Sequence, residues 1–542
     1  MPICTRAAIH LTGKDENILA AVPIIHHVID PARIFHSHGA RHGAMRVGIT
    51  APGQAQTSIE KQPRPTSLRR ICWDQSTVCL LRFACSRITP ARLPGEQVAV
   101  TICFQHCHFI MSIMKPEIRF GCVSAISIML AFAPTGCSKG KSTAGAGTGT
   151  TSLAVSKKLA AIKATGEPMT PEELNNWYAE PPASENAAGV YAQAFSALTT
   201  DDPKSATFLS KNQNALALLL QATERKSCRY PVDLRAGFAT QLPHLANIKK
   251  CAALLQSEAV SQAGRNHTDA AAKAVLAGVR LSRSLEDEPI LISHLVKNAS
   301  LTIAVQGLEQ ALTRKAFTRD QLVSLQAALE SAEVTAPFRQ TLIGERCTAI
   351  SSFQMAPEEL AKVFSQIDGN AKTFAGLTAH MKSPVFQQDF EFALDYFSNM
   401  LAMAKMPFPQ RLDADGGPKI ETAIARQLML SSMLLPALST LPDREAEVAA
   451  RVRVAQTALA VECYRLEHAN ALPGSLSELT PALLKAVPTD PFDGQPLRYK
   501  RLPGNGCVIY SVGKNRQDDQ GASSRTDEKK SQPLDITFTI QR

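Results

Sequence analysis

The chain has 542 residues, of which 45% are hydrophobic and 20% are charged, and its formal net charge at pH 7 is +10. This composition excludes a disordered chain, a collagen-like fibre and a protein with many membrane spans. Aromatic residues make up only 6% of the chain, so a sizeable core must be built mainly from aliphatic side chains.

Residues 1–113 differ from the rest of the chain. They hold eight of the 13 histidines and six of the 13 cysteines, and their 12 Lys and Arg against 6 Asp and Glu supply +6 of the net charge. No helical or strand period persists there. Cys103, His106, Cys107 and His108 resemble half of a zinc site, but the second ligand pair is missing. We therefore expect residues 1–113 to be a disordered extension or upstream sequence that is not translated.

The remaining 429 residues are close to neutral, with 46 Lys and Arg against 42 Asp and Glu. They show no basic stripe with interleaved aromatic residues, which is the usual footprint of a nucleic-acid interface. We therefore expect no nucleic-acid partner.

An export segment is predicted at residues 114–137. Lys115 and Arg119 provide a basic start, and an apolar run follows over residues 120–133. A membrane span needs about 20 apolar residues, so this shorter run is typical of a secretory signal. Because a signal acts near a nascent N-terminus, the segment predicts that translation starts at Met111 or Met114.

Thr135, Gly136 and Cys137 follow the apolar run directly. They resemble the end of a bacterial lipoprotein signal peptide, in which a small residue precedes the cysteine that becomes lipidated. The resemblance implies that Cys137 carries the lipid and that the protein is exported to the cell envelope. A signal anchor and simple secretion are the alternatives. Residues 138–152 are rich in Gly, Ser, Thr and Ala, which predicts a flexible linker.

Residues 153–442 show helical periodicity throughout, and we predict an irregular α-helical array without a fixed repeat. Residues 245–263 and 268–285 predict a helical hairpin. Further helix starts are predicted at Thr170–Pro171, at Ser184–Glu185, near Pro289 and, by a capping box, at Thr318–Gln321. A stripe of Phe and Leu over residues 386–401 predicts a buried helix face.

The array offers few candidates for chemistry. Glu345 and Arg346 are adjacent in an otherwise small and apolar helix, and we interpret them as a structural ion pair, with a ligand contact as the alternative. Five histidines lack metal-binding spacing and are expected to be surface or internally satisfied residues: His244, His267, His294, His380 and His468. Five cysteines lack redox spacing, and one disulfide among them is left open: Cys228, Cys251, Cys347, Cys463 and Cys507.

Residues 443–542 predict a small α+β module. A long helix begins at Asp443, where Asp443, Glu445 and Glu447 complement the helix dipole. A capping box at Ser475–Glu478 starts a short second helix. Three strands are then expected at residues 497–501, 507–512 and 535–540, forming an antiparallel sheet with the long helix on one face. The predicted fold class is therefore mainly α, with this module at the C-terminus.

Residues 449–542 resemble the C-terminal domain of the major pseudopilins of type II secretion. The matching motifs are Ala458–Glu467, Leu472–Gly474, Val487–Phe492 and Tyr510–Gly513. In that family the loop after the last motif binds calcium, and the resemblance implies Asp518 and Asp519 as its carboxylate ligands here. The usual hydrophobic filament helix is missing before the module, which argues against an ordinary filament subunit.

These features favour a non-enzymatic, exported cell-envelope protein that acts as a scaffold for other proteins and meets the membrane through its lipid or signal anchor. The first alternative is an accessory component of a type II secretion or pilus-like system. The second is a hydrolase with a dispersed active site, because catalytic triads are spatial and not sequential. No cofactor other than calcium is expected.

Overall fold

The computed structural model describes residues 152–199, 202–203, 205–333, 336–368, 371–414, 417–522 and 534–541. The predicted extension (residues 1–113), the export segment (114–137) with its Cys137, and all of the linker (138–152) except Ser152 lie outside the described residues.

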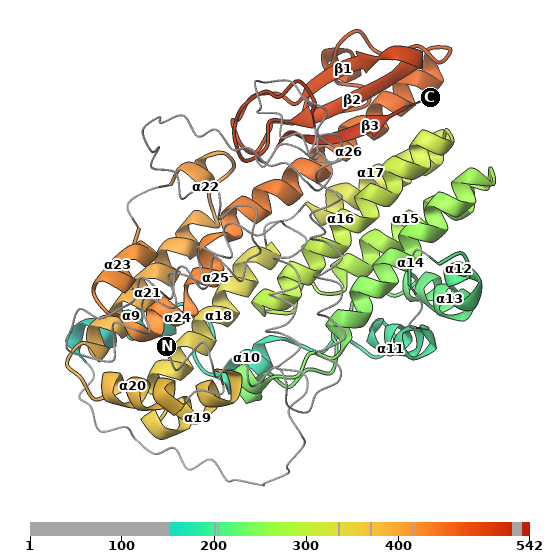
Figure 1. Ribbon diagram of the computed structural model, residues 1–542. Coiled ribbons are helices and arrows are strands. Elements are labelled where there is room, and N and C mark those ends of the chain that lie inside the picture. The colour runs from blue at the N-terminus through green and yellow to red at the C-terminus, as the bar shows by residue number, and fades with distance from the viewer. Residues whose placement is uncertain are drawn as a thin grey trace, which may run out of the picture. The chain divides into compact units, whose positions relative to one another are not determined.

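The described chain is mainly helical and ends in a small antiparallel sheet, which confirms the predicted fold class (Figure 1). None of its helices is both long and apolar enough to cross a membrane. The helices before the C-terminal module are α9 (Leu153–Ala164), α10 (Pro171–Trp177), α11 (Ala188–Ala197), α12 (Phe208–Lys211), α13 (Gln213–Ala222), η1 (Leu234–Ala239), α14 (His244–Gly264), α15 (Thr268–Arg283), α16 (Leu291–Arg314), α17 (Arg319–Ala332), α18 (Ala336–Gln354), α19 (Pro357–Asp368), α20 (Ala371–Met381), α21 (Phe386–Met403), α22 (Gln410–Asp413), α23 (Ile420–Ala425), α24 (Met429–Leu434) and α25 (Pro436–Ser439).

Local sequence signals place several of these helices correctly. Thr318 forms the predicted capping box with Gln321. Thr170 is the predicted N-cap before Pro171, and it also forms a capping box with Glu173 that was not predicted. The predicted start at Ser184 is wrong, because α11 begins at Ala188 without a side-chain cap. Residues 183–185 instead form a turn, and Asn186 then forms an isolated β-bridge with Ser227, where Ala187 donates its N–H to the Ser227 carbonyl.

Helices α14, α15 and α16 pack closely because small residues lie between them. A Cβ atom added at Gly278 of α15 would lie 3.1 Å from the Cβ of Ala304 on α16. Gly307 of α16 faces Gln256 of α14, where an added Cβ would lie 3.4 Å from the Gln256 backbone. An added methyl group would thus be tight against the neighbouring helix, so the glycines allow the three helices to pack closely against one another as one dense bundle.

The C-terminal module consists of α26 (Leu441–Glu467), η2 (Leu476–Leu479), β1 (Arg498–Leu502), η3 (Pro503–Asn505), β2 (Gly506–Ser511) and β3 (Ile536–Ile540). The strands pair antiparallel in the order β1-β2-β3, as predicted. The predicted capping box at Ser475 is present, but the expected second helix is only the single 3₁₀ turn η2.

The helical array and the module share one hydrophobic core. Helix α26 packs against α16 and α17 on one side and against β2 and β3 on another (Figure 1). Leu308, Leu325, Leu459, Ile509 and Phe538 all belong to the same cluster, and each is at most 1% exposed. The predicted boundary between residues 442 and 443 falls inside α26. The module is therefore joined to the array by packing as well as by the chain.

The outer edge of β3 is held by side chains from α16. The N–H of Thr539 donates to Glu309 Oε1 at 2.8 Å, and the Thr539 carbonyl accepts from Thr313 Oγ1 at 3.3 Å. Since an edge strand otherwise presents unpaired backbone groups, these two residues replace a neighbouring strand.

We expect Glu309→Ala to destabilise the protein by about 2 kcal/mol, because the Thr539 N–H loses a charged acceptor at a buried site. Hydrogen exchange at Thr539 should accelerate in the same variant. Urea unfolding and amide exchange measure the two effects. Glu309→Gln keeps an acceptor oxygen and should retain most of the stability; equal loss in both variants would contradict this role.

Candidate functional site

Three of the five histidines form buried pairs with carboxylates from other parts of the chain. The sequence spacing does not reveal these pairs, since their members lie 44, 151 and 9 residues apart. The pairs are His244 with Glu288, His294 with Glu445, and His380 with Asp389. Because each imidazole has a partner, the expectation that these histidines are satisfied internally agrees with the geometry.

Glu445 is the centre of the most highly charged cluster. Its Oε1 lies 2.7 Å from His294 Nε2 and accepts a hydrogen bond of 2.7 Å from Asn298 Nδ2. Lys297 is only 4% exposed, and burial lowers the pKa of its ammonium group. Burial by itself raises the pKa of Glu445, but His294, Lys297 and Asn298 outweigh it and lower the pKa to about 2. Sequence analysis missed this role, because Glu445 was assigned to the helix dipole alone.

Arg411 brings a second buried cation close to this cluster. Its guanidinium lies 4.5 Å from the ring centroid of Phe408 and 5.5 Å from that of Phe338. It donates to the carbonyl oxygens of Ala404 at 2.9 Å and Met406 at 3.1 Å. Burial lowers the pKa of Arg411, while Glu445 acts in the opposite direction. Together these contacts tie the short helix α22 to its neighbours.

A second buried cluster surrounds Glu288. Its Oε1 lies 3.1 Å from His244 Nε2 and also accepts a short hydrogen bond from Ser293 Oγ. The imidazole of His244 stacks on Tyr230, with 4.2 Å between the ring centroids. The carboxylate lies between the serine and the histidine, whereas a hydrolytic triad requires the imidazole between the other two. Within the described residues, Glu288 Oε2 and the hydroxyl of Tyr178 are buried without a hydrogen-bond partner.

The structure gives Glu345 and Arg346 separate partners. Arg346 donates to Glu167 Oε2 at 2.7 Å. Glu345 Oε1 accepts the N–H of Leu291 at 2.8 Å and thereby caps the start of α16 from the neighbouring helix α18. Burial raises the pKa of Glu345 to about 7, partly offset by this hydrogen bond. Both residues therefore take part in structural contacts between elements.

The approach of α18 to the start of α16 requires a glycine. A Cβ atom added at Gly344 would lie 1.8 Å from the carbonyl oxygen of Pro289, which is an impossible distance. Gly344 thus allows Glu345 to reach the N–H of Leu291.

Two of the four motifs on which the predicted pseudopilin resemblance rests meet at Asp490. Its carboxylate accepts hydrogen bonds from the N–H of Phe492 at 3.0 Å and of Val512 at 2.8 Å, and from Ser511 Oγ at 2.9 Å. Arg498 adds an ion pair at 2.8 Å. Asp490 therefore joins the motif around residues 487–492 to the motif around residues 510–513.

The predicted calcium ligands lie beside a third carboxylate, Asp535. Its two oxygens accept the N–H groups of Asp519 at 3.3 Å and Gly521 at 2.7 Å. Burial, together with the charges of Asp519 and Asp518, raises the pKa of Asp535 to about 6, and the two backbone hydrogen bonds act in the opposite direction. Asp518 and Asp519 also each accept a local hydrogen bond.

Carboxylate oxygens of this kind suit calcium chemically, and in this structure those of Asp535 accept two backbone N–H groups. Calcium binding by Asp518 and Asp519 stays a prediction. Across the ranges described above, no group of three His, Cys, Asp or Glu residues could hold a metal.

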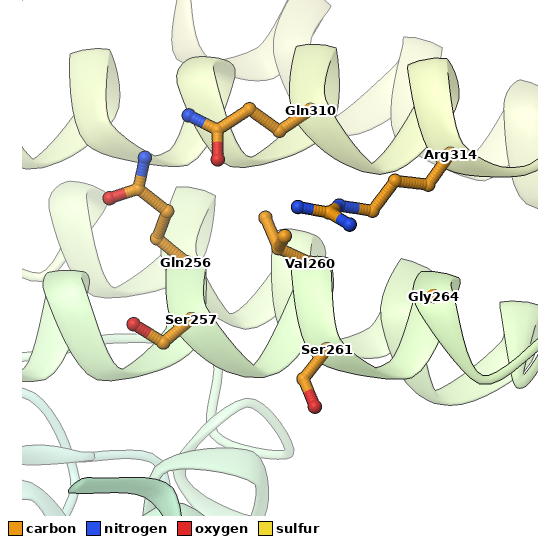
Figure 2. A pocket seen from close by; sticks show the side chains of 7 residues that line it. All are labelled: Gln256, Ser257, Val260, Ser261, Gly264, Gln310 and Arg314. Carbon is orange, nitrogen blue, oxygen red and sulfur yellow. The ribbon is translucent and has the colours of Figure 1, made fainter. Parts of the chain in front are cut away.

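The hollow of greatest interest on the surface is an open groove between α14 and α16, with a volume of about 630 Å³. Figure 2 shows Gln256 of α14 and Gln310 and Arg314 of α16 extending toward the same space, with Val260 between them. Ser257, Ser261 and Gly264 complete the lining. We call this feature the α14–α16 groove. It is lined mainly by neutral hydrogen-bonding side chains, with one cation and no carboxylate.

The described chain contains five cysteines, which form no disulfide with one another: Cys228, Cys251, Cys347, Cys463 and Cys507. Comparison with protein-family models, with curated proteins and with solved structures found no match to this chain.

We expect Glu445→Gln to lower the free energy of unfolding by about 3 kcal/mol at pH 7. The pKa of Glu445 is about 2 in the folded chain against 4.5 as its ordinary value, so the ionised carboxylate stabilises the fold above pH 4.5. This contribution is lost as the pH falls to 2. The difference in the free energy of unfolding between wild type and variant, measured with urea, should therefore become smaller as the pH is lowered from 7 to 3. Glu447→Gln is the matched control; an unchanged difference at pH 3 would contradict the prediction.

Glu345→Gln should have the opposite sign. The pKa of Glu345 is about 7 in the folded chain, so its ionisation costs stability as the pH rises from about 4.5 to 7. The glutamine keeps an acceptor for Leu291 and removes the charge, and we expect a gain of about 2 kcal/mol at pH 8 and almost none at pH 4. Thermal unfolding at the two pH values measures this. Equal destabilisation at both pH values would contradict the prediction, because it would show that the carboxyl group stabilises the fold whatever its charge.

Proposed function

We propose that the protein is an exported cell-envelope protein, lipidated at Cys137, that acts as a non-enzymatic scaffold for other proteins. The order of a basic start, a short apolar run, Gly136–Cys137 and a flexible linker supports export and anchoring. The linker gives the folded part reach above the membrane surface.

The structural observation that carries the scaffold proposal is the shared core of the array and the module. Because α26 is packed against α16, α17 and the sheet, the surfaces of the array and the module keep a fixed relation to each other. Such a unit can present a composite surface to a partner without paying the ordering cost of a mobile domain. The α14–α16 groove is one open, polar part of that surface.

A second candidate function is an accessory role in a type II secretion or pilus-like system. It is favoured by the fold of residues 449–542, which comprise most of α26 and a three-stranded antiparallel sheet. Two of the four motifs, at residues 487–492 and 510–513, are joined through Asp490. Helix α26 is covered by α16 and α17 here, so the module would meet such a machine through its exposed surface.

Site-specific photocrosslinking in the native host tests the proposal. A crosslinking amino acid is placed at the exposed Lys500 of the module or at the exposed Gln310 of the groove, with the exposed Glu330 of α17 as the control. We expect adducts of defined mass from position 500 or 310 and not from 330, in the membrane fraction, together with an intact mass that begins at an acylated Cys137. Adducts with secretion components would favour the second candidate; no adduct from either position would overturn the scaffold.

Deletion of residues 443–542 is not a suitable test of these functions, because removal of α26 would expose the core of the array. A loss of function in such a deletion would report misfolding as readily as a lost partner.

A further inference from the structure

We infer that the α14–α16 groove binds an extended peptide segment whose carboxylate is held by Arg314. This inference rests on the proposed scaffold function and names the chemistry of one partner.

The dimensions of the groove suit a short extended peptide. Gln256 lies near Gly307, and Gly264 lies near Arg314, so α14 and α16 run parallel along the groove. Gln256 and Gly264 are eight residues apart, or about 12 Å along a helix. An extended chain advances about 3.3 Å per residue, so about three or four residues fit between Gln256 and Arg314.

The side chains in the groove match the polar groups of a peptide backbone. Gln256 and Gln310 approach from opposite helices, and each amide both donates and accepts hydrogen bonds, as a peptide unit does (Figure 2). Val260 lies between them and offers apolar contact to a side chain of the ligand. Ser257 is already engaged, because its Oγ donates to the carbonyl of Ala253 at 2.9 Å. The two amides are therefore the main backbone-recognising groups.

Arg314 determines the charge of the ligand. Three nearby arginines have carboxylate partners: Arg283 pairs with Glu286, Arg319 with Glu467, and Arg453 with Glu333. Arg280 of α15 donates instead to the carbonyl of Thr223. Arg314 has no ion-pair partner in the described parts of the chain, and no carboxylate lines the groove. Its position in the last turn of α16 complements the helix dipole, but the dipole leaves the guanidinium N–H donors available. A carboxylate is the group that such a planar set of donors binds best.

Fluorescence anisotropy on the full mature chain tests the inference. The probe is fluorescein-labelled Ala-Ser-Ala-Glu with a free C-terminus, and its amidated, uncharged counterpart Ala-Ser-Ala-Gln is the comparison. We expect the acidic probe to bind the native chain, and Arg314→Gln to weaken it at least tenfold, because charge-assisted hydrogen bonds are lost. Gln256→Ala with Gln310→Ala should weaken both peptides by a similar factor.

The matched control is Lys273→Gln, which removes one positive charge from the exposed face of α15 and should leave binding unchanged. Equal binding of the acidic probe to native and Arg314→Gln protein, or no binding to the native protein, would overturn the inference. The two proposals can be told apart by repeating the photocrosslinking at position 500 in the Arg314→Gln variant. If the crosslinked partners persist there while the peptide does not bind, the scaffold proposal is retained and peptide binding in the groove is rejected.

Discussion

The structure depends on the burial of α26 on more than one side. A helix of 27 residues that carries charges along its length is not an obvious core element, yet Val452, Ala455, Leu459 and Val461 are each at most 1% exposed. Burial of such side chains is worth roughly 1.5–3 kcal/mol each. Because the contacts come from α16 and α17 as well as from the sheet, neither the array nor the module has a complete core without this helix. The helix is thus the common part of two substructures that sequence patterns describe separately.

The same burial explains why charged clusters occur inside the protein. Glu445 is part of α26, and once that helix is packed against α16 its carboxylate must be paired, which His294 and Asn298 accomplish. Glu345 shows the other solution: it has a single backbone donor, and its charged form is disfavoured. The pKa of Glu445 is lowered and that of Glu345 is raised, because Glu445 lies among cations and Glu345 does not. As the pH rises, ionisation of Glu445 therefore stabilises the fold, and ionisation of Glu345 destabilises it.

Sequence patterns predicted the local elements and could not predict the partners. The N-cap at Thr170, the capping box at Thr318 and the strands at residues 497–501, 507–512 and 535–540 depend on neighbours within a few residues, so they were predicted well. The helix start predicted at Ser184 was wrong, because a tertiary hydrogen bond from Ala187 to Ser227 competes with helix formation there. His294, Glu445 and Arg411 could not be grouped in advance, since only the packing of α16, α22 and α26 brings them together. The α14–α16 groove could not be predicted for the same reason. Gln256 and Arg314 carry no sequence signal of a site, and only the packing of α14 against α16 brings them together.

The attachment of β3 to α16 also limits how copies of this protein can associate. A sheet with two open edges can be extended without limit by adding further sheets side by side. Here Glu309 and Thr313 occupy the outer side of β3, so among the described strands only the outer edge of β1 lacks a neighbour, and β1 carries the basic residues Lys500 and Arg501. Association through this edge would join two molecules against the repulsion of their charges, and it would leave no second strand edge to extend the sheet into a fibre.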